Sequence, residues 1–302
     1  MKTVKLALDW TPNTNHIGFF VAQELGFYEE LGLQVELLNP EDDNYALTPA
    51  KKVEMGVADM ALCPLESIIS YQTKKQPFDA VAIATLFQED LSEIVVLEDS
   101  PIERPKELDG HSYASYRARY EDEIVRQMMI NDGGQGTIKL AYPDKLGIWE
   151  TLLSKKYDAT WIFSNWEGVQ ARSKGIKLRG FRLANYDIPY GYSPVIMASK
   201  KRVDENPSLY TTFIEGTRKG FLYSRQTPEK AVAILKPNVS EQDRDIDLLA
   251  SQLETIPAYG NDMNWGRIAS HRVEQFLHWL KSTGLETAPL SWEQLIYSGI
   301  GF

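Results

Sequence analysis

Short apolar runs alternate with amphipathic segments along the chain, and this alternation limits the possible folds more than any other feature. The expected strands are 4–8, 34–38, 56–62, 80–87, 94–97, 111–115, 138–141, 159–163 and 190–198. The expected helices are 17–25, 48–55, 68–74, 121–130, 146–155, 209–225, 228–235, 244–254, 264–283 and 292–297. Strands separated by helices favour βαβ units and a mainly parallel sheet. The sequence therefore predicts an α/β protein.

Composition excludes several classes of function. The chain has 302 residues, 43% of them hydrophobic and 25% charged, which is enough for two lobes with their own cores. Its net charge of -10 argues against a nucleic-acid surface. The single cysteine, Cys63, excludes an intramolecular disulfide and a multi-cysteine metal site. No metal is therefore expected.

The apolar runs also bear on membranes and export. None approaches the roughly 20 residues of a membrane span, so no membrane insertion is expected. The first expected strand begins within a few residues of Met1 and leaves no room for a signal peptide. This start predicts a cytoplasmic protein, or a periplasmic one if a leader has been removed.

A cluster of polar and aromatic residues follows the first strand. The stretch 9–16 reads Asp-Trp-Thr-Pro-Asn-Thr-Asn-His. Pro12 cannot continue a strand ladder because it lacks an N–H, and Asn13 and Asn15 favour turns. The stretch therefore lies between the carboxyl end of a strand and the amino end of a helix, where α/β sheets bind ligands.

This stretch resembles the start of thiamine-pyrimidine-binding proteins. The similarity continues through 20–23, 26–28, 56–59, 161–168 and 190–196. That superfamily includes periplasmic receptors for thiamine pyrimidines and the yeast-type hydroxymethylpyrimidine phosphate synthase. The resemblance implies a type II periplasmic-binding-protein fold, with two α/β lobes, two crossovers near 92–96 and 193–198, and the ligand in the cleft. Lobe one would comprise 1–92 and 197–302 with the C-terminal helices, and lobe two 93–196.

The chemistry of an aminopyrimidine suggests which residues bind it. A flat ring with a polar edge needs aromatic walls and a few fixed donors and acceptors. The candidate walls are Trp10, Trp161, Trp166, Tyr190 and Tyr192. The candidate edge contacts are Asn13, His16, Gln88 and Glu167, with Glu123 added because the resembling receptors place an acidic residue there. Cys63 and Tyr116 complete the set.

Each candidate has a structural alternative. An aromatic residue is often simply part of a core, and a polar loop residue is often simply solvated. His16 could instead cap the following helix, and Cys63 could be an inert residue near the core.

The resembling synthase supplies an enzymatic alternative. It uses a lysine that holds pyridoxal phosphate and a histidine that is consumed to build the pyrimidine. By register these positions fall on Cys63 and Ser67, which can perform neither task. Lys51, Lys52 and the pair 74–75 are nearby in sequence but have the character of solvated surface charge. We therefore expect binding without turnover and no cofactor.

A basic loop leaves the ligand's charge open. The resembling receptors have a glycine-rich loop where this chain has Tyr116-Arg117-Ala118-Arg119-Tyr120. Arg117 and Arg119 could clamp a phosphate or carboxylate, or they could pair with acidic residues of the segment 121–123. The expected ligand is a thiamine-related aminopyrimidine, with a sulfonate or another small anion as an alternative. An ABC transporter permease is a possible partner.

Overall fold

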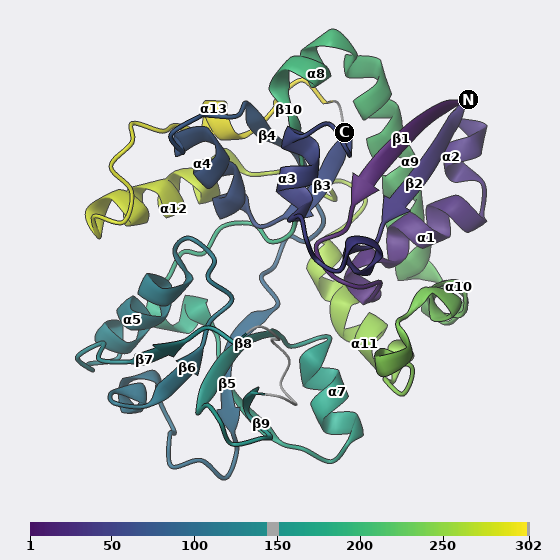
Figure 1. Cartoon of the computed structure of the whole chain (residues 1–302). Helices are drawn as coiled ribbons and strands as arrows, with labels where there is room; N and C mark the ends of the chain where they lie inside the picture. The colour runs from purple at the N-terminus through teal and green to yellow at the C-terminus, as the bar shows by residue number, and fades with distance from the viewer. Residues whose placement is uncertain (144–150, 301–302) are drawn as a thin grey trace. The chain divides into compact units, whose positions relative to one another are not determined.

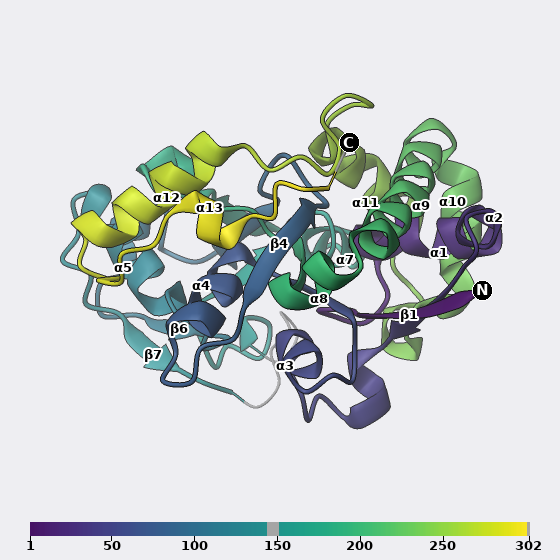
Figure 2. The same ribbon diagram turned by 90° about the horizontal axis from the view of Figure 1, so that it is seen from above.

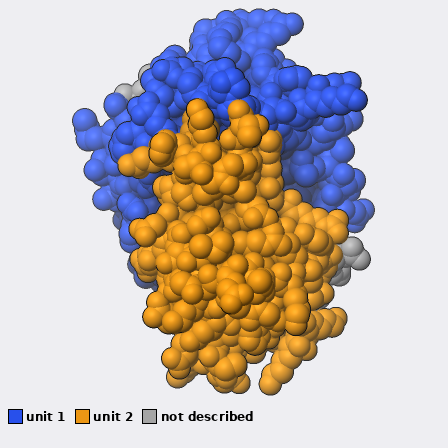
Figure 3. Space-filling model, turned by 90° about the vertical axis from the view of Figure 1, so that its left-hand side faces the viewer, with its two compact units in different colours: residues 1–90, 191–274, 288–302 blue, residues 91–190, 275–287 orange. Residues whose placement is uncertain are grey.

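The computed structural model describes residues 1–143 and 151–300, which form two compact α/β units (Figure 3). Unit 1 comprises Met1–Asp90, Gly191–Glu274 and Ala288–Phe302, and unit 2 comprises Leu91–Tyr190 and Gln275–Thr287. The predicted lobes change at 92/93 and 196/197, and they place the segment Gln275–Thr287 in lobe one rather than with the second unit. The chain crosses between the units at four points, two of which lie near the predicted crossovers.

The sheet of unit 1 has the strand order β2-β1-β3-β10-β4. Its strands are β1 (Lys2–Ala7), β2 (Leu33–Leu38), β3 (Met60–Cys63), β4 (Ala80–Thr85) and β10 (Val195–Ser199). Strands β1, β2 and β3 pair in parallel, whereas β10 runs antiparallel to both β3 and β4. The predicted strand 190–198 is therefore too long at its start, since the strand begins only after Pro194, which has no N–H to donate.

Helices surround the sheet of unit 1 (Figure 1). They are α1 (Ile17–Glu24), α2 (Phe27–Glu30), α3 (Pro49–Glu54), α4 (Leu65–Thr73), α8 (Lys200–Glu205), α9 (Pro207–Gln226), α10 (Pro228–Leu235), α11 (Leu248–Thr255) and α13 (Trp292–Leu295). Helix α12 (Ser270–Ser282) begins in unit 1 and continues in unit 2. The predicted helices 244–254 and 264–283 begin four and six residues later, at Leu248 and Ser270.

Two glycines let α1 pack closely on α9, and both helices lie side by side with α10 in Figure 2. A Cβ atom on Gly220 would lie 1.9 Å from the carbonyl oxygen of Gly18. Only glycine fits at this contact. Residues 17–22 of α1 are apolar and buried, so the helix closes the core beside β1 and positions the segment 9–16 that precedes it.

The sheet of unit 2 has the strand order β7-β6-β8-β5-β9. Its elements are β5 (Ser92–Leu97), β6 (Ser112–Ala114), β7 (Lys139–Ala141), β8 (Ala159–Phe163), β9 (Leu178–Phe181), α5 (Glu121–Asn131) and α7 (Glu167–Ser173). Strands β6, β7 and β8 are parallel, and β5 is antiparallel to both β8 and β9. Strand β9 and helix α7 were not predicted, and part of the predicted helix 146–155 lies outside the described residues.

Each sheet therefore contains one antiparallel strand, and in both cases it is the first strand after a crossing between the units. The predicted α/β class is confirmed, and the mainly parallel pattern holds apart from β5 and β10. Short 3-10 turns complete the described structure: η1 (Thr14–His16), η2 (Pro40–Asp43), η3 (Pro105–Leu108), η4 (Leu183–Tyr186), η5 (Lys236–Asn238), η6 (Glu241–Asp243) and η7 (Ile256–Tyr259). Among the described helices, none is both long and apolar enough to span a membrane.

Candidate functional site

The strand ends of unit 1 bring the first group of predicted residues to one edge of its sheet. Strands β1, β3 and β4 end at this edge, and the antiparallel β10 begins there. The segment 9–16 follows β1, Cys63 closes β3, Gln88 lies three residues beyond β4, and Tyr192 lies three residues before β10. This is the edge at which α/β sheets bind ligands.

A buried imidazole holds a carboxylate at this edge. The His16 side chain is fully buried, and its Nε2 lies 2.7 Å from Asp9 Oδ1. The backbone N–H of Asn13 donates to His16 Nδ1 at 3.4 Å, so Nε2 carries the proton and donates to Asp9. The Asp9 side chain keeps about a quarter of its surface exposed. His16 therefore fixes the direction of a partly exposed carboxylate.

The amide of Asn13 is also used within the turn. Its Oδ1 accepts from the backbone N–H of Asn15 at 2.8 Å, and its Nδ2 donates to the carbonyl of Thr11 at 3.0 Å. The residue is only 3% exposed. Asn13 and His16 were predicted to contact the ligand edge, but both side chains are engaged inside the segment that presents Asp9 and Trp10. Asp9 lies in the same stretch 9–16, but the sequence pattern did not single it out as a ligand contact.

A second aromatic ring lies against Trp10. The Trp10 and Tyr45 ring centroids are 6.0 Å apart, with an interplanar angle of 53°. Tyr45 is 49% exposed and follows η2 in a left-handed backbone conformation, with φ of 59°, directly after Asn44 at 51°. A bulky residue in this region costs on the order of 1 kcal/mol or more, and such strain is concentrated at functional sites. No sequence signal pointed to Tyr45.

The remaining unit 1 candidates are occupied within the unit. Cys63 is buried with its Sγ 3.8 Å from Met197 Sδ, and burial raises the pKa of its thiol. Gln88 Nε2 donates to the carbonyls of Asn264 and Arg267 at 3.0 and 2.9 Å. Tyr192 is buried, and its hydroxyl accepts from the Ala269 N–H at 3.0 Å. These three side chains contribute to the frame of the strand-end edge.

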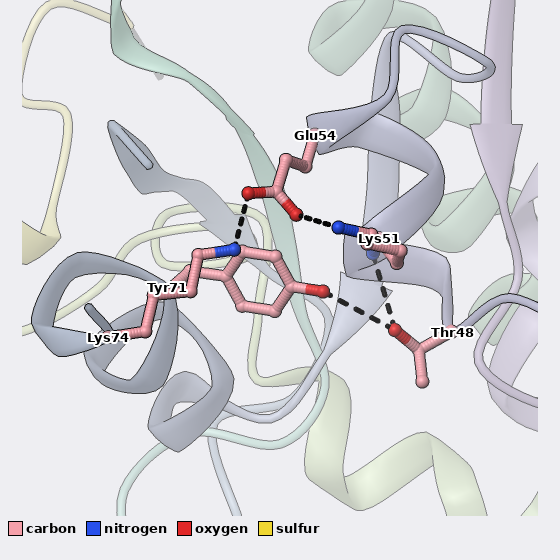
Figure 4. Close-up of polar contacts among 5 residues, drawn as sticks. All are labelled: Thr48, Lys51, Glu54, Tyr71 and Lys74. Carbon is pink, nitrogen blue, oxygen red and sulfur yellow. Dashed lines mark hydrogen bonds and ion pairs between the residues drawn. The ribbon is translucent and has the colours of Figure 1, made fainter. Parts of the chain in front are cut away.

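Three of the lysines near β3 are held in ion pairs, as Figure 4 shows for two of them. The Glu54 carboxylate on α3 forms two ion pairs. Its Oε2 lies 2.7 Å from Lys51 Nζ, and its Oε1 pairs with Lys74, which follows α4. The Lys52 side chain is buried, 6% exposed, and its Nζ lies 3.1 Å from Asp43 Oδ2.

Tyr71 completes the polar contacts between α3 and α4. Its hydroxyl lies 3.5 Å from the Thr48 hydroxyl, and its ring centroid lies 4.2 Å from Lys74 Nζ (Figure 4).

Pyridoxal phosphate would need an imine-forming lysine at the position of Cys63, and a buried thiol cannot replace it. The residues around β3 therefore do not fit that cofactor.

Unit 2 brings two of its three predicted aromatic walls together. Trp161 in β8 and Tyr190 have ring centroids 5.4 Å apart and meet edge to face. Trp166 is 2% exposed and is the N-cap residue of α7. Glu167 Oε2 accepts from the backbone N–H of Phe163 at 2.9 Å and so closes the turn between β8 and α7. The pair of Trp161 and Tyr190 is thus the more accessible aromatic surface.

The basic loop after β6 is closed by an internal carboxylate. Glu121, 2% exposed at the start of α5, accepts from the N–H groups of Tyr116 and Ala118 at 3.0 and 3.1 Å. It also accepts from the hydroxyl of Tyr113 at 2.7 Å. Burial raises the pKa of the Glu121 carboxyl, while these donors act in the opposite direction. Sequence reasoning considered Glu121 only as a partner for the arginines.

The two arginines of the loop contact groups outside the segment 121–123. Arg119 donates to Glu286 at 2.6 Å, and the guanidinium of Arg117 lies 4.4 Å from the Tyr142 ring centroid. Tyr116 is 36% exposed. Glu123 forms an ion pair with Arg126 on the same helix.

Comparison with known proteins places the chain. Residues 13–231 match the family model described as NMT1/THI5 like. The chain belongs to this family. The match runs from the turn that supports Asp9 through the first part of the C-terminal helices, and it confirms the resemblance found in the sequence.

Two relatives from this comparison carry different names. The chain is 23% identical to the formylaminopyrimidine-binding protein of Halalkalibacterium halodurans over 89% of its own length and 84% of that protein. It is also 23% identical to the 4-amino-5-hydroxymethyl-2-methylpyrimidine phosphate synthase of Legionella pneumophila, over 77% of this chain and 72% of the synthase.

A solved structure defines the fold. The periplasmic aliphatic sulphonate binding protein SsuA from Escherichia coli superposes with a TM-score of 0.69 at 15% identity, covering 99% of this chain and 92% of SsuA. The family member described here therefore has the periplasmic-binding-protein fold, as predicted.

Proposed function

We propose that this protein binds a thiamine-related aminopyrimidine, such as hydroxymethylpyrimidine or a formylaminopyrimidine, and releases it unchanged. The relative from Halalkalibacterium halodurans is named for binding a formylaminopyrimidine, and the family and fold are shared. In this proposal Trp10 and Tyr45 offer ring surfaces for stacking, and Asp9 accepts a hydrogen bond from the exocyclic amine.

The Asp9 carboxylate is the observation that carries the proposal. Its Oδ1 is fixed by the buried His16, and its side chain remains partly exposed, one residue before Trp10. A carboxylate accepts hydrogen bonds and donates none, so it matches the amine of an aminopyrimidine. A protonated ring nitrogen would add charge assistance to the contact.

The same carboxylate disfavours the sulfonate alternative. A sulfonate is an anion with acceptor oxygens only, so the negative charge of Asp9 would repel it. SsuA shares the fold with this chain at 15% identity, so its ligand is not transferred by the comparison.

The enzymatic alternative is also less well supported. The Legionella pneumophila relative is named as a synthase, but Cys63 occupies the predicted lysine position and its thiol lies buried against Met197. Lys51, Lys52 and Lys74 are engaged in ion pairs, which lowers their availability for imine formation. Binding without chemical change is the simpler role for these residues.

The fold also suggests where the protein works. Proteins of this fold include periplasmic receptors, so we propose delivery of the ligand to an ABC transporter, in the periplasm. Storage or transfer of the pyrimidine inside the cell is the corresponding role for a cytoplasmic protein.

Calorimetric titration tests the proposal. The purified protein is titrated with hydroxymethylpyrimidine, with N-formyl-4-amino-5-aminomethyl-2-methylpyrimidine, and with an alkanesulfonate of similar size. Saturable binding of either pyrimidine with no sulfonate binding is expected. Binding of the sulfonate alone would contradict the proposal, and turnover of a bound precursor in the presence of pyridoxal phosphate would favour the enzyme.

A further inference from the structure

A set of buried polar side chains contacts the turn η1, which follows Asp9 and Trp10 in unit 1. Helix α11 packs against this turn, and η7 continues directly from α11. The members of the set carry a hydroxyl or an amide group and are at most 1% exposed: Thr14, Ser251, Gln252, Thr255 and Tyr259. Buried polar groups are costly unless they are hydrogen-bonded, so their contacts with one another fix their positions.

Thr14 is the residue of the turn that joins this set. Its Oγ1 lies 2.7 Å from the hydroxyl oxygen of Ser251 and 3.3 Å from that of Thr255. Thr255 also donates to the carbonyl of Ser251 at 2.7 Å, which fixes its hydroxyl on α11. The first residue of η1 is therefore held to α11 by a short hydrogen bond between two hydroxyl groups.

The segment that follows α11 adds a second contact with the turn. The Tyr259 hydroxyl lies 3.5 Å from the carbonyl oxygen of Thr14. The same hydroxyl lies 3.2 and 3.3 Å from the two polar atoms of the Gln252 amide. Both the side chain and the backbone of Thr14 thus face polar groups of α11 and η7.

The turn transmits the position of Thr14 to the proposed binding edge. Thr14 and His16 are the two ends of the three-residue turn η1, and the His16 N–H donates to the carbonyl of Asn13 at 3.0 Å. A displacement of Thr14 in so short a turn also displaces the imidazole of His16. The hydrogen bond from His16 Nε2 to Asp9 Oδ1 depends on direction, so the carboxylate would then be held differently.

We propose that Thr14 is a positioning residue for ligand binding. Its hydroxyl, held by Ser251 and Thr255, sets the imidazole of His16 and through it the carboxylate of Asp9. Groups that orient a binding side chain from behind in this way commonly affect affinity without touching the ligand. The choice of an aminopyrimidine as the ligand rests on the proposed function. The effect of Thr14 on the hydrogen bond between His16 and Asp9 is independent of that choice.

Imidazole NMR of the ligand-free protein is the first test. The buried His16 is expected to give a slowly exchanging, downfield Nε2–H signal because it donates to a carboxylate. The other three histidines, at positions 111, 271 and 278, are at least partly exposed. Thr14→Val keeps the shape of the side chain and removes its hydroxyl, so it should move the His16 signal upfield. Thr14→Ser keeps the hydroxyl and should leave the signal near its wild-type position.

Calorimetric titration with hydroxymethylpyrimidine measures the consequence for binding. Thr14→Val is expected to bind roughly 3- to 10-fold more weakly, and Thr14→Ser to restore most of the affinity. A folded Thr14→Val protein with the wild-type signal and affinity would overturn the proposal, and so would an equal change in Thr14→Ser. Ser251→Ala removes the partner hydroxyl instead, and the same two measurements on this variant decide the matter if Thr14→Val does not fold.

Thr217→Val is the matched control. Thr217 is also a fully buried threonine of unit 1, and its hydroxyl donates to the carbonyl of Phe213 at 2.8 Å and lies 2.8 Å from the Tyr28 hydroxyl. The control should leave the His16 signal and the affinity unchanged, and an equal change would show general loosening rather than positioning. If the wild-type protein binds no pyrimidine, the proposed function fails, while the His16 signal in Thr14→Val still decides the role of Thr14.

Discussion

Replacing Asp9 by asparagine tests the proposed binding edge with the smallest possible change. Asp9→Asn keeps the side-chain shape and an oxygen that can accept from His16 Nε2, which lies 2.7 Å from Asp9 Oδ1. The backbone N–H of Asn13 keeps His16 Nδ1 as an acceptor and therefore keeps the proton on Nε2. The new amide must turn its oxygen toward His16, so its NH2 group replaces the second oxygen of Asp9.

This orientation sets the expected loss of affinity. The amine of the pyrimidine would face another donor instead of a carboxylate oxygen. A hydrogen bond to a charged group contributes about 1.5–3 kcal/mol. The loss corresponds to a roughly 10- to 150-fold weaker affinity for hydroxymethylpyrimidine. Protein stability should change little because the contact with His16 is retained.

Calorimetric titration with hydroxymethylpyrimidine measures the change, and thermal unfolding shows whether the variant is folded. Asp59→Asn is the matched control, since Asp59 is also a partly buried carboxylate of unit 1 and accepts from the Lys5 N–H at 2.8 Å. Its affinity should equal that of the wild-type protein. A folded Asp9→Asn protein that binds the pyrimidine as tightly as the wild type would refute the assigned role of Asp9.

Three further predictions concern other parts of the structure. Tyr45→Asn should weaken pyrimidine binding by roughly 2- to 10-fold in calorimetry, because a stacking ring is lost. Its free energy of unfolding should change by less than about 1 kcal/mol, because asparagine tolerates the left-handed conformation. Gly220→Ala should lower that free energy in urea titrations by about 1–3 kcal/mol or more, since the new Cβ would lie 1.9 Å from the Gly18 carbonyl oxygen. The hydrogen bond from the Gln135 N–H lowers the pKa of the Asp109 carboxyl. The ionised Asp109 therefore contributes stability above about pH 4, where an unfolded aspartate titrates, and this contribution is lost as the pH falls through the folded pKa.

Each of these predictions has a control or a result that would contradict it. Gly32 has a positive φ of 76°, but no atom lies within 4 Å of an added Cβ, so Gly32→Ala should lower the free energy of unfolding less than Gly220→Ala. An equal loss for both would contradict the steric argument. Unchanged affinity in Tyr45→Asn would remove Tyr45 from the site. Urea titrations at pH 7 and pH 3 should show that Asp109→Asn lowers stability mainly at pH 7, and an equal loss at both values would contradict the linkage.

The sequence predicted the architecture well because most of its signals are local. Apolar runs such as 80–87 and breakers such as Pro12 are set by propensity and by the missing N–H of proline, and these effects act over a few residues. The alternation of strands and helices then leaves few possible topologies. Strand β9 was missed because Leu178–Phe181 contains Arg179 and Gly180 and has no clear alternation.

The direction of polar side chains within the site was harder to predict. Asn13 and His16 had the right chemistry for ligand contacts, but their side chains form hydrogen bonds within the segment 9–16. Asp9, which precedes Trp10 at the end of a buried strand, was the available signal for an outward carboxylate. Glu121 could have been found from its position in the first turn of a helix, where a carboxylate commonly satisfies free N–H groups.

The sequence by itself determined the α/β class, the family resemblance and the place of the first polar turn, because these follow from local propensity and from a specific run of residues. Only the tertiary structure decided that Tyr45 lies against Trp10, that Arg119 is directed to Glu286, and that Gln88 is held by the loop at Asn264. These partners are 35, 167 and 176 positions apart, and no local rule connects them. Folding sets which hydrogen-bonding groups are satisfied internally, and what remains exposed is what a ligand can contact.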